Sequence, residues 1–473
     1  MFGRMRFYLA LWLALLAMWA SRILGRGSGS ALPGKLALAI DPAILKRLAR
    51  GVKRIIVVTG TNGKTTTNNM LVSILRAGGY TVVANLAGAN LITGVTTAFL
   101  AAAGWRGCLQ ADYASLEVDE ASLPGVLEFL SPRLVVVTNF FRDQLDRYGE
   151  LDKTVAIVAE ALQKQKQEIH LILNADDPLV AQLSIRTGRP AMFYGLTNVA
   201  VNSCSYSGAD SREGRFCPFC GQVLSYSYYN YSQLGSYSCL QCGFSRPEPD
   251  VEGVQVCRAR GCLSCQVTVK QGRSVMLSLP LEGIYNIYNA LAACSAGLYL
   301  GLPAQVMANA LAHYQTATGR LERFTYHDKQ VLLNLVKNPA GFNAALQLIA
   351  NVEPVPLDIL IAINDNAADG RDISWLWDVD FEMLSQFAGK TGKFVCTGQR
   401  GAEMALRLKY AGMAAEQIVY IPDYEQAVKT VLQAQGRGVY MLATYTALWP
   451  VERVVNSYAR RERAGSARLS PVS

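Results

Sequence analysis

Histidine is scarce in this sequence of 473 residues, which contains only three. His170, His313 and His327 all lie outside the motifs that contain cysteine. A cysteine nucleophile is activated by an adjacent base, which is usually a histidine. The sequence therefore predicts that this chain does not perform cysteine–histidine chemistry by itself.

Charged residues are also few, at 17%, against 51% hydrophobic residues, a balance typical of packed domains and not of disordered chains. The net charge of +9 is concentrated at one end of the chain. Residues 1–54 contain ten lysines and arginines and one acidic residue, Asp41, which gives +9 and leaves residues 55–473 neutral. This distribution argues against a nucleic-acid groove and predicts that the N-terminal segment meets an anionic surface.

The apolar run at residues 7–21 has fifteen residues, fewer than the about 20 that a spanning helix needs. Arginines flank it on both sides. It could lie in a membrane interface, pack against the body of the protein, or act as a spanning or signal segment. Residues 25–33 predict a flexible break, so residues 1–45 form an N-terminal helix and linker.

Residues 54–67 predict a phosphate-binding loop. A β-branched strand at 55–58 leads into a glycine turn and a helical pattern at 68–76. Backbone N–H groups at such a helix N-terminus bind phosphate, a lysine reaches the β- and γ-phosphates, and a threonine hydroxyl can ligate Mg²⁺. ATP and Mg²⁺ are the expected ligands. The candidate residues are Gly60, Thr61, Asn62, Gly63, Lys64, Thr65 and Thr66.

The following segments alternate between strand and helix, which predicts an α/β fold with a doubly wound parallel sheet. The expected strands are 81–85, 107–117, 134–138, 170–174 and 274–279. Polar residues follow several of them, and Mg²⁺ on a nucleotide needs one or two carboxylates. These residues are Glu117, Asp119, Glu120, Asn139, Asp143, Asp146, Asn174, Asp176 and Asp177. At least one is expected to be a metal ligand.

Four cysteines have the spacing of a zinc ribbon. Cys217 and Cys220 form one pair, Cys239 and Cys242 form the other, and eighteen residues separate the pairs. Four thiolates complete a tetrahedral structural site, in an insertion at about residues 204–250. Two disulfides are the alternative, but a nucleotide-dependent enzyme favours the cytoplasm and reduced thiols. We treat the further cysteines 257, 262 and 265 as core or free thiols. A zinc-ribbon nucleic-acid binder driven by ATP is an alternative that the neutral body argues against.

A second α/β series begins near residue 330 and predicts a smaller Rossmann-like domain at 319–458. Its expected strands are 331–335, 357–363, 394–396, 418–421 and 439–442. The domain at 46–318 precedes it, and residues 459–473 are expected to be a disordered tail.

Together these motifs resemble the Mur ligase family over most of the chain. The motifs are Gly-Thr-Asn-Gly-Lys-Thr-Thr at 60–66, Glu117, Thr138-Asn139, Asp143 to Asp146, Asn-Ala-Asp-Asp-Pro at 174–178, Tyr-Asn-Ile-Tyr-Asn at 285–289 and Gly-Arg-Leu-Glu at 319–322. The four-cysteine insertion and the stretches 335–341 and 364–375 narrow the resemblance to the MurT-type synthetase subunit of lipid II isoglutaminyl synthase.

The resemblance implies a reaction. Such proteins use ATP to activate the α-carboxylate of D-glutamate in the lipid II stem peptide as an acyl phosphate, which ammonia converts to D-isoglutamine. A partner glutaminase of the GatD type supplies the ammonia. The resemblance thus implies a heterodimer in the cytoplasm that acts on lipid II and could touch the inner face of the membrane.

The resemblance also implies residue roles. Lys64 and Thr65 lie on the ATP phosphates and Mg²⁺, and Glu117 lies on Mg²⁺. Asn289 lies near the adenine and Arg320 near the nucleotide. Asp372 completes a Cys–His–Asp triad whose other two members belong to the glutaminase, with Asp365 and Asp369 as neighbouring alternatives.

The chain departs from amino-acid-adding Mur ligases at three points. One is Asn334, which stands where those ligases have an aspartate for the ribose. The other two bear on the nucleophile. Gln144 replaces a histidine, and Val155-Ala-Ile-Val-Ala159 occupies the region where those enzymes place a carbamylated lysine. Both departures suit delivery of ammonia. A conventional Mur or folylpolyglutamate-type amino-acid ligase is the alternative.

Overall fold

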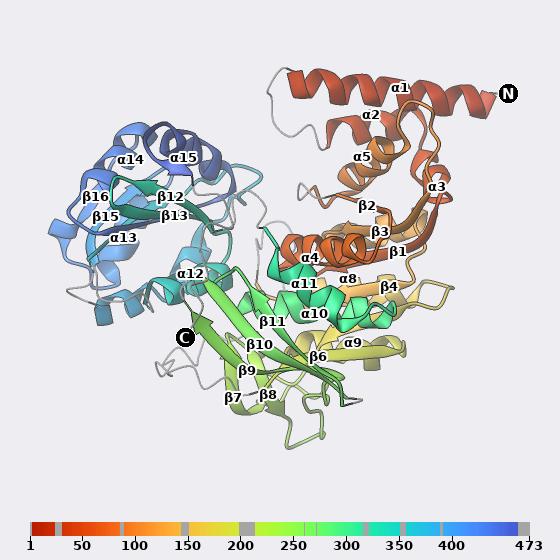
Figure 1. The fold of residues 1–473 in the computed structure, drawn as a ribbon. Helices are drawn as coiled ribbons and strands as arrows, with labels where there is room; N and C mark the ends of the chain where they lie inside the picture. Colours follow the sequence, from red (N-terminus) through yellow and green to blue (C-terminus); the bar gives the residue numbers. More distant parts are fainter. Residues whose placement is uncertain are drawn as a thin grey trace, which may run out of the picture. The chain divides into compact units, whose positions relative to one another are not determined.

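The computed structural model describes residues 2–23, 31–85, 89–142, 151–197, 213–259, 261–270, 272–315, 321–350, 356–387 and 391–461. Contacts divide them into two compact units. Unit 1 holds the described residues up to Tyr314 apart from Arg142, and unit 2 holds Arg142 and the described residues from Gln315 onward (Figure 1). Residues 25–30 of the linker, residues 462–473 of the predicted tail, Arg320 and the stretch 143–146 lie outside the described residues. At the start of the predicted tail, β18 (Arg460–Arg461) is described and pairs with β12 (Glu322–Tyr326).

Unit 1 is built on a nine-stranded sheet with the order β11-β10-β9-β6-β5-β4-β1-β3-β2. All neighbours from β2 to β9 are parallel, whereas β10 and β11 continue the sheet in antiparallel fashion. This confirms the doubly wound parallel sheet. The strands are β1 (Val52–Thr59), β2 (Val82–Ala84), β3 (Ala111–Glu117), β4 (Leu134–Val137), β5 (His170–Asn174), β6 (Ala191–Leu196), β9 (Val251–Ala259), β10 (Cys262–Val269) and β11 (Ser274–Leu279).

The central strand β1 separates two halves of the sheet. The chain runs from β1 to β2 and β3 on one side and then crosses to β4 on the other. A ligand site is expected beyond the carboxyl end of the strand where the order reverses. Glu117 pairs with Val58 across one edge of β1, and Val137 pairs with Thr59 across the other. The residues after β3 and β4 therefore flank the turn that follows β1.

Helices cover both faces of this sheet (Figure 1). α4, α10 and α11 pack against one another. Helices α1 to α3, α5, α6, α8 and α9 contribute to the largest core, which also contains Ile55 and Val57 of β1. The helices are α3 (Ile44–Ala49), α4 (Lys64–Ala77), α5 (Ile92–Ala103), η1 (Glu120–Ser122), α6 (Leu123–Phe129), α8 (Leu151–Gln163), α9 (Pro178–Thr187), α10 (Tyr285–Tyr299) and α11 (Ala304–Ala312).

The N-terminal apolar run forms α1 (Phe2–Ile23), which packs on α2 (Leu32–Ile40), and α2 packs on α5 (Figure 1). Leu11, Ala14 and Leu15 belong to the core of unit 1, so packing against the body is correct for that face of the helix. Among the described residues, no helix combines the length and apolar character needed to cross a membrane.

The cysteine insertion is a hairpin of β7 (Ser225–Tyr231) and β8 (Leu234–Ser238), preceded by η3 (Glu213–Arg215). Its small core contains Cys217, Leu224, Tyr237, Cys239 and Phe244. The cysteines that follow the hairpin lie on β9 and β10, two strands that the sequence pattern did not reveal.

Unit 2 contains a seven-stranded sheet with the order β16-β15-β14-β17-β13-β12-β18. The strands from β16 to β13 are parallel, as in the Rossmann-like arrangement expected. Alternate residues of β14 enter two cores: Ile359 and Ile361 join the first, and Leu360 joins the second.

The strands of unit 2 are β12 (Glu322–Tyr326), β13 (Lys329–Leu335), β14 (Leu357–Ala362), β15 (Thr391–Thr397), β16 (Ile418–Tyr420), β17 (Gly438–Ala443) and β18 (Arg460–Arg461). Its helices are α12 (Pro339–Ala350), η4 (Ser374–Asp378), η5 (Phe381–Phe387), α13 (Gly401–Tyr410), η6 (Ala415–Gln417), α14 (Tyr424–Gln433) and α15 (Tyr445–Tyr458).

Candidate active site

The loop between β1 and α4 requires glycine at two positions. Gly60 and Gly63 have φ angles of +113° and +83°, a region that other residues rarely adopt. A Cβ atom at position 60 would lie 2.4 Å from Oγ1 of Thr138, and one at position 63 would lie 2.1 Å from Oδ1 of Asn289. The glycines thus allow the loop to lie directly against the residues after β4 and against α10.

Asn139 holds this loop in place. Its Oδ1 accepts the N–H of Asn62 at 2.8 Å, and its Nδ2 donates to the carbonyl of Asn62 at 3.0 Å. The Thr61 N–H donates to the backbone carbonyl of Asn139 at 2.8 Å, and the Thr138 hydroxyl donates to the Asn62 carbonyl at 2.8 Å. These bonds fix the loop conformation without a ligand. The sequence placed Asn139 at a strand end but did not show this role.

Lys64, the first residue of α4, is buried and lies beside carboxylates. Its Nζ is 2.9 Å from Oε2 of Glu120 and donates to the carbonyl of Thr61 at 3.2 Å and to that of Gly60. Burial disfavours the charge, but attraction to Glu120, Asp119 and Glu117 outweighs burial and raises the pKa of Lys64. Lys64 is therefore cationic, and the sequence did not predict its ion pair with Glu120.

The N-terminus of α4 offers backbone N–H groups to an anion. The Thr67 N–H donates to the Gly63 carbonyl at 2.8 Å. In the described part of the chain, no side chain caps the helix at Gly63, so the N–H groups of residues 64–66 face the loop without such a cap. Thr65 and Thr66 are half-buried at this end. The arrangement fits a phosphate group.

Glu117 ends β3 next to the loop and is 3% exposed. Its Oε1 accepts a hydrogen bond from Asn90 at 3.3 Å, whereas its Oε2 is buried without a hydrogen-bond partner among the described residues. The Glu117 N–H donates to Oδ1 of Asn85 at 2.9 Å, and Nδ2 of Asn85 donates to the Glu117 carbonyl at 2.7 Å. A fixed carboxylate with an unpartnered oxygen fits a hard cation such as Mg²⁺.

The two aspartates that follow β5, Asp176 and Asp177, are held by structural partners instead. Asp177 is fully buried, accepts the N–H groups of Phe140 and Leu179 at 2.9 Å each, and caps α9. Its neighbour Asp176 is also fully buried and binds Arg246, with Nε 2.7 Å from Oδ1. Neither side chain is a solvated loop residue.

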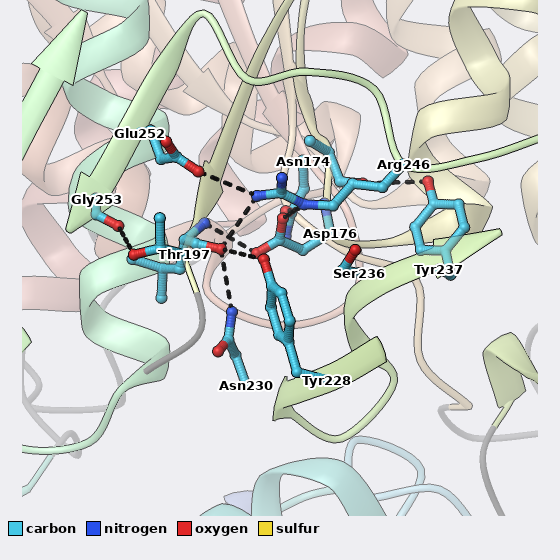
Figure 2. A network of polar contacts seen from close by, with 12 residues as sticks. Asn174, Asp176, Thr197, Tyr228, Asn230, Ser236, Tyr237, Arg246, Glu252 and Gly253 are labelled. Atoms are coloured by element: carbon cyan, nitrogen blue, oxygen red, sulfur yellow. Dashed lines mark hydrogen bonds and ion pairs between the residues drawn. The ribbon is translucent and has the colours of Figure 1, made fainter. Parts of the chain in front are cut away.

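Asp176 connects three segments of unit 1. Figure 2 shows Arg246 reaching Asp176 from the segment after β8, with Glu252 on the other side of the guanidinium. The Tyr288 hydroxyl donates to Oδ2 of Asp176 at 2.6 Å. The next residue, Asn289, accepts a hydrogen bond from the Thr67 hydroxyl at 3.3 Å. A continuous set of contacts therefore runs from the cysteine hairpin to the phosphate loop.

The four predicted cysteines come together. The ligand atoms of Cys217, Cys220, Cys239 and Cys242 all lie within 4.8 Å of one another. In each pair, a glycine after the second cysteine donates its N–H to the carbonyl of the first, at 2.9 Å in one pair and 3.0 Å in the other. Backbone N–H groups of residues 242 and 241 lower the pKa of Cys239 to about 6, which favours a thiolate. The donor set fits zinc.

Among the described residues, no other group of this kind is present, so Cys257, Cys262 and Cys265 form no second metal site there. Cys265 is fully buried, Cys262 is partly buried and Cys257 is exposed.

The three aspartates after β14 have different surroundings. Asp365 binds Arg400, with Oδ2 2.6 Å from Nη2. Asp369 is 3% exposed and accepts the Thr446 N–H at 2.7 Å at the start of α15. Asp372 accepts the N–H and the hydroxyl of Ser374, at 2.8 and 2.9 Å, and remains half-buried. These two hydrogen bonds lower the pKa of Asp372, so it is ionised.

The inner face of α8 is apolar apart from Thr154. Val155, Val158 and Ala159 are buried there, whereas Lys153 on the same helix is exposed. The side chains that face the core in this helix therefore include no lysine at 155–159. Asp143, Gln144 and Asp146 lie outside the described residues.

Comparison with known proteins identifies the family. The Mur ligase middle domain matches residues 58–217, and the MurT ligase C-terminal region matches residues 335–448. The chain is 37% identical to "Lipid II isoglutaminyl synthase (glutamine-hydrolyzing) subunit MurT" of Staphylococcus aureus (strain COL), over 96% of this chain and 98% of that protein. The chain belongs to the MurT family.

Another MurT subunit, from Streptococcus pneumoniae (strain ATCC BAA-255 / R6), is also 37% identical, over 89% of this chain and 91% of that protein. Members of the MurT family are Mur-type ligases, and this chain is accordingly an ATP-dependent ligase. Mur ligases use ATP and Mg²⁺, which the phosphate loop and Glu117 can accommodate.

Solved structures agree on the fold of this MurT-family chain. A pseudomurein peptide ligase type C from Methanothermus fervidus has a TM-score of 0.68 at 23% identity and covers 86% of this chain and 79% of its own. MurF from Acinetobacter baumannii has a TM-score of 0.64 at 18% identity, and the match covers 90% of this chain and 80% of that chain. Both have the Mur ligase fold.

Proposed function

We propose that this chain is the synthetase subunit of a lipid II isoglutaminyl synthase. It would use ATP to phosphorylate the α-carboxylate of D-glutamate in the lipid II stem peptide. Ammonia would then displace phosphate from the acyl phosphate and leave D-isoglutamine. The observation that carries this proposal is the full-length likeness to two MurT subunits, in a chain whose Lys64 lies charged at a glycine loop.

The chemistry follows from the loop. A carboxylate is a poor electrophile, so amide formation needs an activated acyl group, and transfer of the γ-phosphate supplies one. The loop N–H groups would hold the phosphates, and Lys64 would exchange contact with Glu120 for the charge that develops during transfer. Thr65 and Glu117 would hold Mg²⁺, which adds positive charge at the phosphates. Asn289 contacts the loop and would lie near the nucleotide.

We propose ammonia as the nucleophile because the buried residues Val155, Val158 and Ala159 occupy the inner face of α8. Amino-acid-adding relatives would place a carbamylated lysine in that region. The source would be a glutaminase partner of the GatD type. Among this chain's own histidines, His170 stacks on Tyr299, with 4.2 Å between the ring centroids. We place the heterodimer in the cytoplasm, where ATP and reduced thiols are found.

Among the three candidate aspartates, Asp372 is best suited to orient a histidine of the partner. Asp365 is held by Arg400, and Asp369 is buried under the N-terminus of α15. Asp372 is ionised, its hydrogen bonds within the described ranges come from the adjacent Ser374, and the charge of Arg142 also favours its ionised form. Because the side chain is only half-buried, a partner can reach the carboxylate.

The experiment mixes the purified pair with lipid II, ATP and either glutamine or ammonium. Amidated product and ADP are expected with both nitrogen sources. Absence of the mass change of amidation would contradict the proposal, and turnover with an amino acid but none with ammonium would indicate a conventional ligase. Asp372→Asn should lower glutamine-dependent turnover and retain ammonium-dependent turnover. Asp423→Asn is the control, since the Asp423 carboxylate also accepts a nearby backbone N–H in unit 2, at the N-terminus of α14, and is exposed.

A further inference from the structure

Helix α1 is apolar on all sides between residues 7 and 20 but is covered on one side only. Its covered side contributes Ala10, Leu11, Ala14, Leu15 and Met18 to the core. The opposite side carries large exposed side chains, which we call the α1 apolar face: Met5 (67% exposed), Leu9 (53%), Trp12 (48%), Leu13 (43%), Leu16 (49%) and Trp19 (62%). Their spacing of three and four residues puts them in one stripe. Such a helix normally lies inside a core or in a membrane.

The α1 apolar face is continuous with a residue from another element. The indole N–H of Trp12 donates to the backbone carbonyl of Trp105 at 3.1 Å, and Trp105 is itself 54% exposed. Together with Trp105, the α1 apolar face therefore presents three exposed tryptophans. Tryptophan is enriched where an apolar phase meets water, because the ring is apolar and its N–H is polar.

Positive charge lies close to this stripe. In the 3.6-residue repeat of the helix, Arg6 falls beside Leu13 at the edge of the stripe, and Arg4, near the N-terminal end of the helix, is also exposed. Lys35 of α2 and Arg106, next to Trp105, are also exposed. The one acidic residue of residues 1–54, Asp41, is 2% exposed and binds Arg47 at 2.9 Å. Residues 1–54 therefore have no exposed carboxylate that would offset their positive charge at the surface.

We propose that the α1 apolar face docks on an anionic phospholipid bilayer, with α1 lying in the plane of the interface and its arginines on the headgroups. The positive charge of residues 1–54 favours an anionic bilayer over a second copy of the chain. Two copies of the chain would bring two segments of +9 together, whereas anionic lipids neutralise them. This deepens the proposed function, because it would hold the enzyme at the surface from which a lipid-anchored substrate projects.

A series of packed helices connects the α1 apolar face to the active site. α1 packs on α2 and α2 on α5. α5 begins at Ile92, two residues after Asn90, which donates to Glu117 at 3.3 Å. The layer that carries the apolar face thus ends beside the candidate Mg²⁺ ligand within the same unit.

The test uses the full chain with its partner and vesicles that contain no lipid II. Wild type should sediment with phosphatidylglycerol–phosphatidylcholine vesicles and far less with pure phosphatidylcholine. Binding should weaken between about 0.1 M and about 0.5 M salt. Leu9→Glu and Leu16→Glu should each weaken binding at least about tenfold, because each carries a carboxylate into the apolar layer. Ile185→Glu is the matched control, since Ile185 is also an exposed helical aliphatic residue of unit 1, at 62%.

Activity separates docking from chemistry. Leu16→Glu should lose turnover of lipid II in vesicles and keep turnover of a water-soluble stem-peptide fragment, with an unchanged unfolding temperature. Equal binding to neutral and anionic vesicles would overturn the proposal. So would unchanged binding of both glutamate variants, or a dimer that Leu16→Glu dissolves while vesicles are not bound. If wild type turns over neither substrate, the proposed function fails, and the vesicle measurement still decides the docking.

Discussion

Arg246 and Asp176 form a buried ion pair that ties the cysteine insertion to the main sheet. The guanidinium Nε lies 2.7 Å from Oδ1 of Asp176, and the two side chains are 13% and 0% exposed. Burial raises the pKa of Asp176, and Arg246, Tyr288 and the Leu196 N–H oppose that rise. Because Tyr288 precedes Asn289 on α10, the insertion supports the helix that touches the phosphate loop.

Arg246→Met should destabilise the protein strongly, because it leaves a buried carboxylate without its cation. We expect a loss of about 3–5 kcal/mol in the free energy of unfolding of unit 1. Asp176→Asn combined with Arg246→Met should recover part of that loss. Lys270→Met is the control, since its pair with Glu248 is 55% and 75% exposed and should contribute little. Denaturant unfolding of the wild type and the three variants measures these losses. Equal losses for Arg246→Met and Lys270→Met would contradict a stabilising role that depends on burial of the Arg246–Asp176 pair.

Gly63→Ala should weaken ATP binding by about 10- to 100-fold, because it combines an unfavourable φ angle with a collision against Asn289. Gly79→Ala is a matched control. Gly79 has almost the same φ, +84°, but a Cβ there would meet nothing within 4 Å. Nucleotide titration should show a clear defect only for position 63. Because Asn289 is itself placed near the nucleotide, Asn289→Ala alone is the reference for the double variant. If the collision is the cause, adding Gly63→Ala to Asn289→Ala should weaken ATP binding much less than adding it to wild type, and an equal loss in both would place the cause elsewhere.

Lys64→Met should lower ATP-dependent turnover at least about 100-fold, because the cation that meets the transferring phosphate is removed. It should also destabilise the protein, since Glu120 loses its buried partner. Glu120→Gln in the same chain should restore stability but not turnover. Product formation and unfolding, measured on the single and double variants, separate the two effects. Recovery of turnover in the double variant would show that Lys64 acts only through folding.

Cys217→Ser should release zinc from the purified protein and destabilise the hairpin, because three thiolates hold the ion less well than four. Cys257→Ser should keep its zinc, since Cys257 is an exposed thiol outside the cluster. Metal analysis of the two variants gives the result. Wild-type protein purified without zinc under reducing conditions would refute a zinc site.

Asp177 makes stability depend on pH. Burial raises its pKa to about 7 from 3.8. Between these values the folded carboxyl keeps a proton that the unfolded chain has lost, so the free energy of unfolding falls as pH rises through this window, by at most about 1.4 kcal/mol per pH unit. Asp177→Asn cannot titrate, so its stability relative to wild type should improve from pH 4 to 7 and then level off. Unfolding curves across this range test the slope, and parallel curves would contradict it.

Several features of the site were predictable because each depends on neighbours in the sequence. The strand, the two glycines and Lys64 lie within one short stretch, and both cysteine pairs have local spacing. The alternation of strands likewise gave the doubly wound sheet. The strands β9 and β10 were missed, although β10 carries a sequence signal, since Leu263, Cys265 and Val267 are buried and alternate with polar residues. The partner of Lys64 was also missed, because Glu120 lies 56 residues away in the sequence.

The sequence alone determined the fold class, the phosphate loop and the cysteine cluster, since local spacing sets backbone conformation and ligand geometry. Only the tertiary structure decided which carboxylates remain available. Glu117 keeps an unpartnered oxygen among the described residues, whereas Asp176 is bound by Arg246 from 70 residues away. The fold also decided which face of α1 is covered, because an apolar helix does not specify in its sequence which side meets the core. Burial and pairing depend on distant segments meeting in space, and that information appears only once the chain has folded.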